Sequence, residues 1–119
     1  MNACDTAIAA ARLCDEHKAE DIAILDIREL AQFADYFVLC TGLSSRQLKA
    51  IAESVRVGLK AQGIEKLGRE GEPASGWLLL DYVDVLVHIF SGEARNYYQL
   101  ELLWGDAPRV DWRDADAAS

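Results

Sequence analysis

The amino-acid sequence predicts a single α/β domain in which helices flank a mixed sheet of about five strands. Two segments, residues 3–18 and 45–62, place apolar side chains at the three- and four-residue spacing of an amphipathic helix. Residues 22–27, 36–41, 77–82 and 85–90 form short runs rich in β-branched and aromatic residues, a composition typical of strands. We assign the domain to residues 1–112 and expect residues 113–119 to form a flexible acidic tail.

The first helix is expected to run from about Ala3 to Lys18, because Asn2 can cap its N-terminus and Asp5 lies in its first turn. The apolar face of this helix carries Cys4, Ala7, Ile8, Ala11 and Cys14. The two strands that follow, residues 22–27 and 36–41, are both expected to be buried on two faces.

The second helix, residues 45–62, begins at a predicted capping box formed by Ser44 and Gln47 and ends near Gly63. Its apolar stripe consists of Leu48, Ile51, Ala52, Val55 and Leu59. A strand, a helix and a further strand joined by a right-handed crossover imply that part of the sheet is parallel.

The C-terminal half is expected to begin with a short strand near residues 65–69 and a polar loop at residues 69–76. The strands 77–82 and 85–90 then form a hairpin with a tight turn at Tyr82 and Val83. A β-branched residue resists the positive φ of a two-residue primed turn, so the turn type and register stay open. Ser91 is expected to cap a short helix that begins at Gly92 or Glu93. Residues 105–119 have little beyond Val110 and Trp112 to bury, so we expect this end to fray.

The charge of the chain opposes direct binding to duplex nucleic acid. Twelve Lys and Arg face twenty Asp and Glu, a net charge of −8, and we expect the basic residues to be scattered rather than arranged in the basic stripe that phosphate binding needs. An acidic domain suits a basic protein partner, although solubility alone would also explain the charge. No apolar run approaches the roughly 20 residues of a membrane span. Three cysteines without a CxxC pair, and no secretory signal, favour reduced thiols and a cytoplasmic protein.

Two patterns could suggest catalysis. Asp81, Asp84 and His88 lie within eight residues of one hairpin, but a zinc or two-metal site normally needs further ligands that the sequence does not supply. We therefore expect the two carboxylates to bind turn amides and His88 to be a half-buried strand residue. The turn at residues 41–45 could receive a phosphate, yet it lacks the P-loop lysine and the dinucleotide glycine spacing. We predict no catalytic residue, no metal site and no cofactor.

A third pattern predicts a protein-binding surface. Aromatic residues are enriched at the centres of protein interfaces, and Trp77 follows a loop that contains glycine and serine. An aromatic side chain flanked by carboxylates suits a partner that offers an apolar pocket bordered by Lys or Arg. The predicted partner-binding residues are Glu72, Trp77, Leu79, Asp81, Tyr82 and Asp84. For Tyr97 and Leu100 we favour a place in the core.

The same segments resemble the ribosomal silencing factor (Iojap) family. The resemblance extends from Asp21 to Asp106 and rests on four motifs. They are Ala-Asp-Tyr-Phe-Val-Leu-Cys-Thr-Gly at 34–42, Ser-Arg-Gln at 45–47, the hairpin at 76–90, and the aromatic helical segment at 93–106. The chain departs from the family at Val83, where a glycine is common.

The resemblance implies a mixed sheet flanked by helices in a nucleotidyltransferase-like topology, often in a homodimer. It also implies binding to the large ribosomal subunit through a small β-barrel ribosomal protein on the intersubunit face. Occupying that protein blocks joining with the small subunit and represses translation under nutrient limitation. The family's recognition surface corresponds to residues 77–84 and their acidic neighbours.

Two other functions stay open on the sequence. The first is a nucleotide-binding or nucleotidyltransferase-like enzyme, although active transferases carry an acid, apolar, acid triplet on a strand. Here Asp81 and Asp84 are three residues apart and at a turn. The second is a self-associating scaffold with no ribosomal role.

Overall fold

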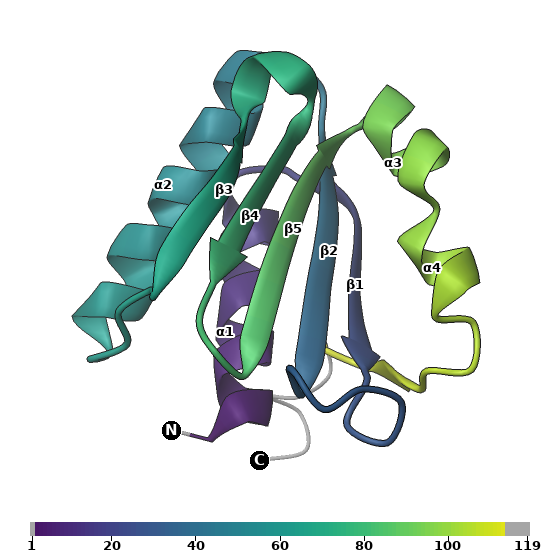
Figure 1. Ribbon diagram of the computed structural model, residues 1–119. Helices are drawn as coiled ribbons and strands as arrows, with labels where there is room; N and C mark the ends of the chain where they lie inside the picture. Colours follow the sequence, from purple (N-terminus) through teal and green to yellow (C-terminus); the bar gives the residue numbers. More distant parts are fainter. Residues whose placement is uncertain (1, 114–119) are drawn as a thin grey trace.

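The computed structural model describes residues 2–113 and contains one mixed sheet of six strands in the order β3-β4-β5-β2-β1-β6 (Figure 1). The elements in chain order are α1 (Ala3–Glu16), β1 (Glu20–Asp26), β2 (Tyr36–Gly42), α2 (Ser45–Ala61), β3 (Gly68–Glu72), the 3₁₀ turn η1 (Pro73–Ser75), β4 (Trp77–Asp81), β5 (Val85–Ser91), α3 (Gly92–Tyr98), α4 (Leu100–Leu103) and β6 (Arg109–Val110). The predicted α/β class is confirmed, with six strands in place of about five.

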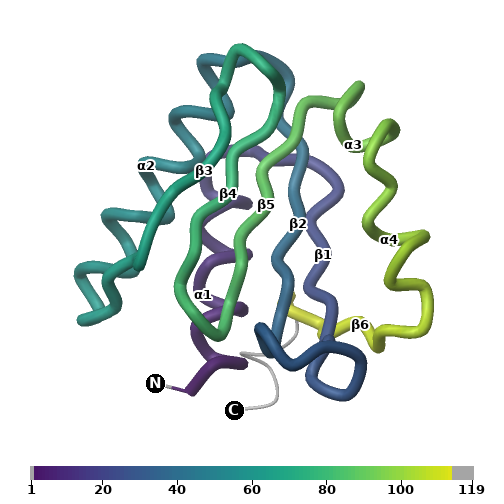
Figure 2. The backbone as a smooth tube through the Cα atoms, viewed as in Figure 1, coloured from purple at the N-terminus to yellow at the C-terminus, as the bar shows by residue number. Residues whose placement is uncertain are grey.

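The sheet is parallel only between its two central strands. β2 pairs in parallel with β5, whereas β1 with β2, β3 with β4, β4 with β5, and β1 with β6 are antiparallel. The chain leaves β2 through α2 and reaches the far edge at β3, then returns through the β4–β5 hairpin to the middle of the sheet (Figure 2). The expected mixed sheet with a partly parallel pairing is therefore confirmed.

The predicted helix caps form. The Asn2 side chain accepts a hydrogen bond from the Asp5 N–H (2.8 Å), and the Ser44 hydroxyl accepts one from the Gln47 N–H (3.1 Å). The side chain of Gln47 does not close a standard capping box, because its Oε1 accepts from the N–H of Leu43, one residue before the cap (2.6 Å). Ser91 caps α3 through the N–H of Ala94 (3.1 Å).

Two apolar clusters lie on the two faces of the sheet. α1 and α2 cover one face, and all five predicted stripe residues of α2 are buried there. α3 and the segment after it cover only part of the other face, over β5, β2 and β1 (Figure 1). Strand β2 is buried along its whole length as expected. β1 begins with the exposed Glu20 and Asp21, ahead of the predicted residues 22–27, of which Ile22 and Asp26 are half-buried and the other four are buried.

One prediction for the C-terminal half is wrong, and the short strand expected near residues 65–69 is shifted to residues 68–72. Residues 69–76 are not a polar loop, since Gly68–Glu72 form the edge strand β3 and Pro73–Ser75 a 3₁₀ turn. Charged residues suit an edge strand, which explains why this segment does not look like a strand in the sequence. The segment after Gly105 adds the strand β6, and Trp112 is buried with its indole N–H 3.4 Å from the Ile22 carbonyl. Residues 114–119 of the expected tail lie outside the described residues.

The hairpin turn also differs from the expected two-residue turn. Val83 has a φ of 72°, and the Asp84 N–H donates to the Tyr82 carbonyl (2.9 Å), the hydrogen bond of a γ-turn. The Val83 N–H donates to Oδ1 of Asp81 (2.8 Å). The predicted role of Asp81 as an acceptor for turn amides is confirmed, and the β-branched residue is held at a φ that it rarely adopts.

Candidate protein-binding face

The sheet face opposite α1 and α2 presents three rows of side chains that run across the strands. Residues directly opposite one another in neighbouring strands share a face, so the pairing register defines these rows. The rows are Glu72–Trp77–Phe90–Thr41, Glu70–Leu79–His88–Leu39 and Gly68–Asp81–Leu86–Phe37. Each row runs from the edge strand β3 toward β2. We call this surface the aromatic face.

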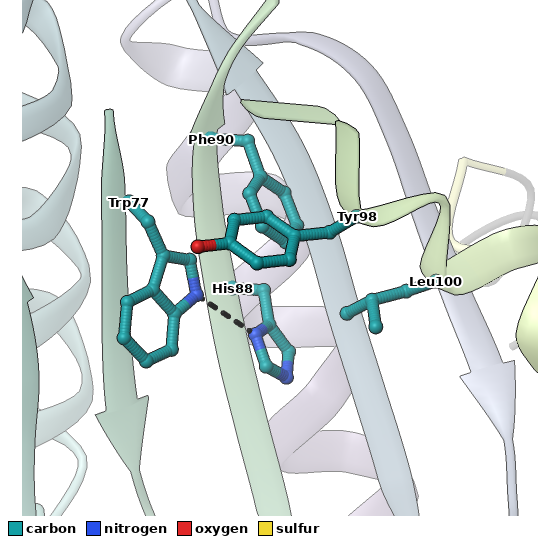
Figure 3. Close-up of a pocket in the computed structure, with 5 residues that line it drawn as sticks. All are labelled: Trp77, His88, Phe90, Tyr98 and Leu100. Carbon is teal, nitrogen blue, oxygen red and sulfur yellow. Dashed lines mark hydrogen bonds between the residues drawn. The ribbon is translucent and has the colours of Figure 1, made fainter. Parts of the chain in front are cut away.

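Trp77 and His88 form the polar contact at the centre of the aromatic face. The indole Nε1–H of Trp77 donates to Nδ1 of His88 over 3.3 Å, and Figure 3 shows the two rings side by side on β4 and β5. The imidazole also stacks on Phe90, with ring centroids 5.7 Å apart and planes within 4°. Two neighbouring strands and a hydrogen bond therefore hold the indole in one orientation.

A small apolar pocket opens beside this pair. Its volume is about 130 Å³, and its lining consists of Trp77, His88, Phe90, Tyr98 and Leu100 (Figure 3). β4 and β5 supply three of these residues and the α3–α4 segment supplies two. A pocket of this size accommodates one side chain rather than a whole cofactor.

His88 is neutral in this environment. The residue is only 9% exposed, and burial lowers the pKa of its imidazole to about 4. Since Nδ1 accepts from Trp77, the proton of the neutral ring sits on Nε2, which has no hydrogen-bond partner among the described residues. The predicted half-buried histidine is in fact buried, because Phe37 packs edge-on against its ring at 5.1 Å.

The backbone of β3 lies directly against Trp77. Gly71 has a φ of 85°, and a Cβ atom there would lie 2.3 Å from the carbonyl oxygen of Trp77 and 2.8 Å from its ring atom Cε3. Only glycine fits this position. The edge strand therefore supports the back of the indole.

Carboxylates border the aromatic face along β3 and the hairpin turn. Glu72 lies opposite Trp77 in the β3–β4 register, Glu70 lies opposite Leu79, and Asp81 ends the third row. Glu70, Glu72 and Asp84 are exposed. Among the described residues none of these four carboxylates forms an ion pair with Lys or Arg, so the charges of the three exposed ones face solvent and that of the half-buried Asp81 is not neutralised.

The structure brings together most of the predicted partner-binding residues, but not all of them. Glu72, Trp77, Leu79 and Asp81 share the aromatic face, and Asp84 is exposed at its hairpin end. Tyr82 does not share it, because its side chain is buried in the cluster under α1 and α2. Burial raises the pKa of the Tyr82 phenol to about 12. The prediction of a core position for Tyr97 is wrong, since this residue is 83% exposed on α3.

The aromatic face continues over residues that the sequence reasoning missed. Phe33 is exposed, and its ring lies 6.1 Å from Phe37 and 6.2 Å from Trp104. Leu86 and Trp104 are half-buried against the same cluster. The alternation of apolar residues along β5 could have identified Leu86, but Phe33 stands in a loop with no periodic signal.

The largely buried side chain of Arg95 attaches the α3–α4 segment to the sheet. Arg95 donates from Nη1 to the hydroxyl of Thr41 (3.0 Å) and from Nε to Glu101 (2.7 Å). Arg109 donates to the second oxygen of Glu101 (2.9 Å), and the hydrogen bond from Arg95 holds the pKa of that carboxyl below its usual range. These contacts fix the position of Tyr98 and Leu100 over the pocket.

The geometry gives little support to the alternative of a nucleotide-binding or nucleotidyltransferase-like enzyme. Within residues 2–113, no three His, Cys, Asp or Glu side chains converge on a possible metal position. In the turn at residues 41–45, the hydroxyl of Thr41 accepts from Arg95 and that of Ser44 caps α2. No helix within the described residues is long and apolar enough to span a membrane.

Comparison with known proteins finds a matching family model, related proteins and a similar solved structure. The family model described as "ribosomal silencing factor during starvation" matches residues 1–119. The ribosomal silencing factor RsfS of Bacillus subtilis is 44% identical over 102 residues, which cover 86% of each chain. The chloroplastic protein Iojap of Zea mays is 34% identical over 106 residues, which cover 88% of this chain and 46% of that protein. A crystal structure of a protein from Chromobacterium violaceum superposes with a TM-score of 0.84 at 37% identity, covering 88% of each chain.

Proposed function

Because the chain belongs to the ribosomal silencing factor family, we propose that it binds the large ribosomal subunit and blocks joining with the small subunit. Translation would then fall when nutrients are short, in keeping with the starvation named in the family description. We further propose that the protein acts by binding rather than by catalysis, and that it does so in the cytoplasm.

The observation that carries this proposal is the aromatic face with its acidic border. Trp77 lies at the open edge of an apolar surface, held by His88 and supported from behind by Gly71. Aromatic side chains fixed in this way lose little conformational entropy on binding and are common hot spots of protein interfaces.

The acidic border indicates the chemistry of the partner. Glu70 and Glu72 lie on the β3 side of Trp77 and Leu79, and Asp81 follows Leu79 on β4. None of the three has a cationic partner among the described residues. A partner that inserts an apolar side chain beside the indole and places Lys or Arg opposite the carboxylates fits this face. We propose the small β-barrel ribosomal protein on the intersubunit face of the large subunit as that partner.

A homodimer is also part of the proposal. Tyr97, Leu102 and Leu103 are each more than 70% exposed on the α3–α4 segment, which borders the aromatic face. Three exposed large apolar side chains on one short segment are consistent with self-association of the free protein.

The test is a sucrose-gradient profile of a cell extract, with the protein detected in every fraction. The proposal predicts co-sedimentation with free large subunits and absence from translating ribosomes, since a factor that masks the joining face excludes the small subunit. A protein found mainly in polysomes would contradict the anti-joining mechanism. A protein that sediments away from ribosomes at every salt concentration would favour a scaffold with no ribosomal role.

A further inference from the structure

Half of the basic residues of this acidic chain lie in one continuous segment. Residues 45–69 contain six Lys and Arg and two Glu, a net charge of +4, within a chain whose net charge is −8. The six are Arg46, Lys49, Arg56, Lys60, Lys66 and Arg69. The sequence-based expectation that the basic residues are scattered does not hold for these six in three dimensions.

Helix α2 places four of them in a single stripe. Arg46, Lys49, Arg56 and Lys60 follow one another at intervals of three, seven and four residues, and Glu53 fills the gap in the middle. Residues at this spacing lie along one side of a helix. The stripe extends over about 21 Å and is separate from the buried stripe that faces the sheet.

The remaining two basic residues join the stripe from the segment that enters β3. A groove of about 230 Å³ is lined by Arg56 and Lys60 of α2 and by Glu65 and Lys66. Arg69 lies opposite Leu80 in the β3–β4 register, and Leu80 is buried under α2, so both face the helix side of the sheet. The positive charges of Lys66 and Arg69 add to the effect of Arg56 in lowering the pKa of the Glu53 carboxyl.

The two acidic residues neutralise only part of this charge. Glu53 is held in a bidentate pair by Arg56, and Glu65 lies 3.9 Å from the ammonium group of Lys60. Arg46, Lys49 and Arg69 are exposed and form no ion pair among the described residues. The stripe and the groove therefore present excess positive charge to solvent.

We propose that this basic groove binds the phosphate backbone of RNA on the large ribosomal subunit, an inference that rests on the proposed function. In residues 45–69 the exposed large apolar residues are Val57 and Leu67, and none is aromatic. A row of cations with so little apolar surface suits a repeating polyanion better than an acidic protein surface, which would need a packed apolar centre. β3 is the edge strand beside β4, and α2 lies next to this edge in Figure 1. Since α2 carries Arg56 and Lys60 of the groove and β4 carries Trp77, the groove and Trp77 flank the same edge of the sheet. One partner surface can therefore contact both.

The acidic remainder of the molecule determines how strongly this groove binds. Carboxylates more than about 8 Å from a phosphate are largely screened at physiological salt, so they weaken the contact without abolishing it. Docking of the aromatic face would hold the groove beside RNA at a high effective concentration. We expect weak binding to free RNA and a measurable contribution on the intact subunit.

The test measures the affinity of the full-length protein for purified large subunits as a function of salt concentration. The variant carries Lys49→Gln and Lys60→Gln, two exposed positions of the stripe. The matched control carries Arg28→Gln and Arg113→Gln, which change the net charge equally at exposed positions outside the groove. The variant should bind about tenfold more weakly at low salt, with a slope of log affinity against log salt reduced by about 1.5, and the control should match the wild type.

Three outcomes would overturn the inference. If the wild type binds and the variant keeps the slope and affinity of the control, the groove makes no phosphate contact. If a photoreactive benzophenone residue at position 49 labels only ribosomal protein and no RNA, the groove serves an acidic protein segment. If the wild type itself fails to bind large subunits, the proposed function fails together with the inference about the groove. This result differs from the first outcome, in which the wild type binds and only the inference about the groove fails.

Discussion

The indole N–H of Trp77 donates a 3.3 Å hydrogen bond to Nδ1 of His88, and this bond connects the proposed anchor of the interface to a buried neutral imidazole. Protonation of Nδ1 would remove the acceptor and place a charge beside Phe37 and Phe90. The orientation of Trp77 and the charge of His88 are therefore coupled.

The stability of the protein should fall as the pH falls from about 6.5 to 4 because of His88. Burial lowers the folded-state pKa to about 4, so the unfolded chain binds more protons in this window. The contribution is fully present above the unfolded pKa of about 6.5 and amounts to about 3 kcal/mol. Urea unfolding at pH 7 and pH 4.5 measures it. His88→Phe should lose much of this pH dependence, and His17→Gln, at the exposed histidine, should keep it.

Gly71→Ala should destabilise the fold far more than the same change at two other glycines. A Cβ at Gly71 meets the Trp77 backbone at 2.3 Å, in addition to the strain of φ 85°. Gly63 has a similar φ of 83° but open space, and Gly68 has open space and no positive φ. We expect losses of about 3 kcal/mol or more at Gly71, about 1 kcal/mol at Gly63 and almost none at Gly68. Equal losses of stability at Gly71 and Gly63 in thermal unfolding would show that the contact between the added Cβ atom and Trp77 does not destabilise the fold.

Val83→Gly should stabilise the protein by about 1 kcal/mol. Val83 is 57% exposed and has a φ of 72°, so glycine relieves backbone strain and loses little burial. Val57→Gly is the control, because Val57 is similarly exposed but lies inside α2, where glycine lowers helix stability. Denaturant midpoints should move in opposite directions for the two variants. A lower midpoint for Val83→Gly would argue against strain at this turn.

Arg95→Ala should destabilise the α3–α4 segment by about 2–4 kcal/mol, since it leaves Glu101 and Thr41 without their buried donor. The Arg95 side chain is 11% exposed, whereas the Arg28 side chain, paired with Asp26, is 57% exposed. Arg28→Ala is therefore the matched control, with an expected loss below about 1 kcal/mol. Hydrogen exchange of amides in residues 92–103 measures the local effect. Similar protection in both variants would contradict the anchoring role.

The parts of the fold that follow periodic patterns could be predicted from the sequence. The stripe of α2 and the caps at Asn2, Ser44 and Ser91 depend on local spacing, and each forms as expected. The sequence pattern places the edge strand β3 too early in the chain, near residues 65–69, because its charged residues within 69–72 suit a strand only when its place at the sheet edge is known. β6 is two residues long and depends on pairing with β1.

The candidate site was predictable only in part, because some of its contacts depend on strand pairing rather than on local spacing. Alternation along β4 places Trp77, Leu79 and Asp81 on one face, which the strand pattern alone indicates. The same alternation places Tyr82 with Leu78 and Leu80 on the other face, where the structure buries it, so the strand pattern itself opposes the choice of Tyr82 as a partner-binding residue. The contact between Trp77 and His88 depends on the register of the β4–β5 hairpin.

The central claim is that Trp77 anchors binding to the large ribosomal subunit, and paired measurements of large-subunit affinity and thermal unfolding test it. Trp77→Ala should weaken binding by about 2 kcal/mol or more, the scale of a hot-spot aromatic residue, while the protein stays folded. Trp77→Phe, which keeps an apolar ring but loses the hydrogen bond to His88, should bind with intermediate affinity. Arg113→Ala, at an exposed position outside both the aromatic face and the basic groove, should bind like the wild type. A folded Trp77→Ala protein that binds large subunits with undiminished affinity would contradict the account.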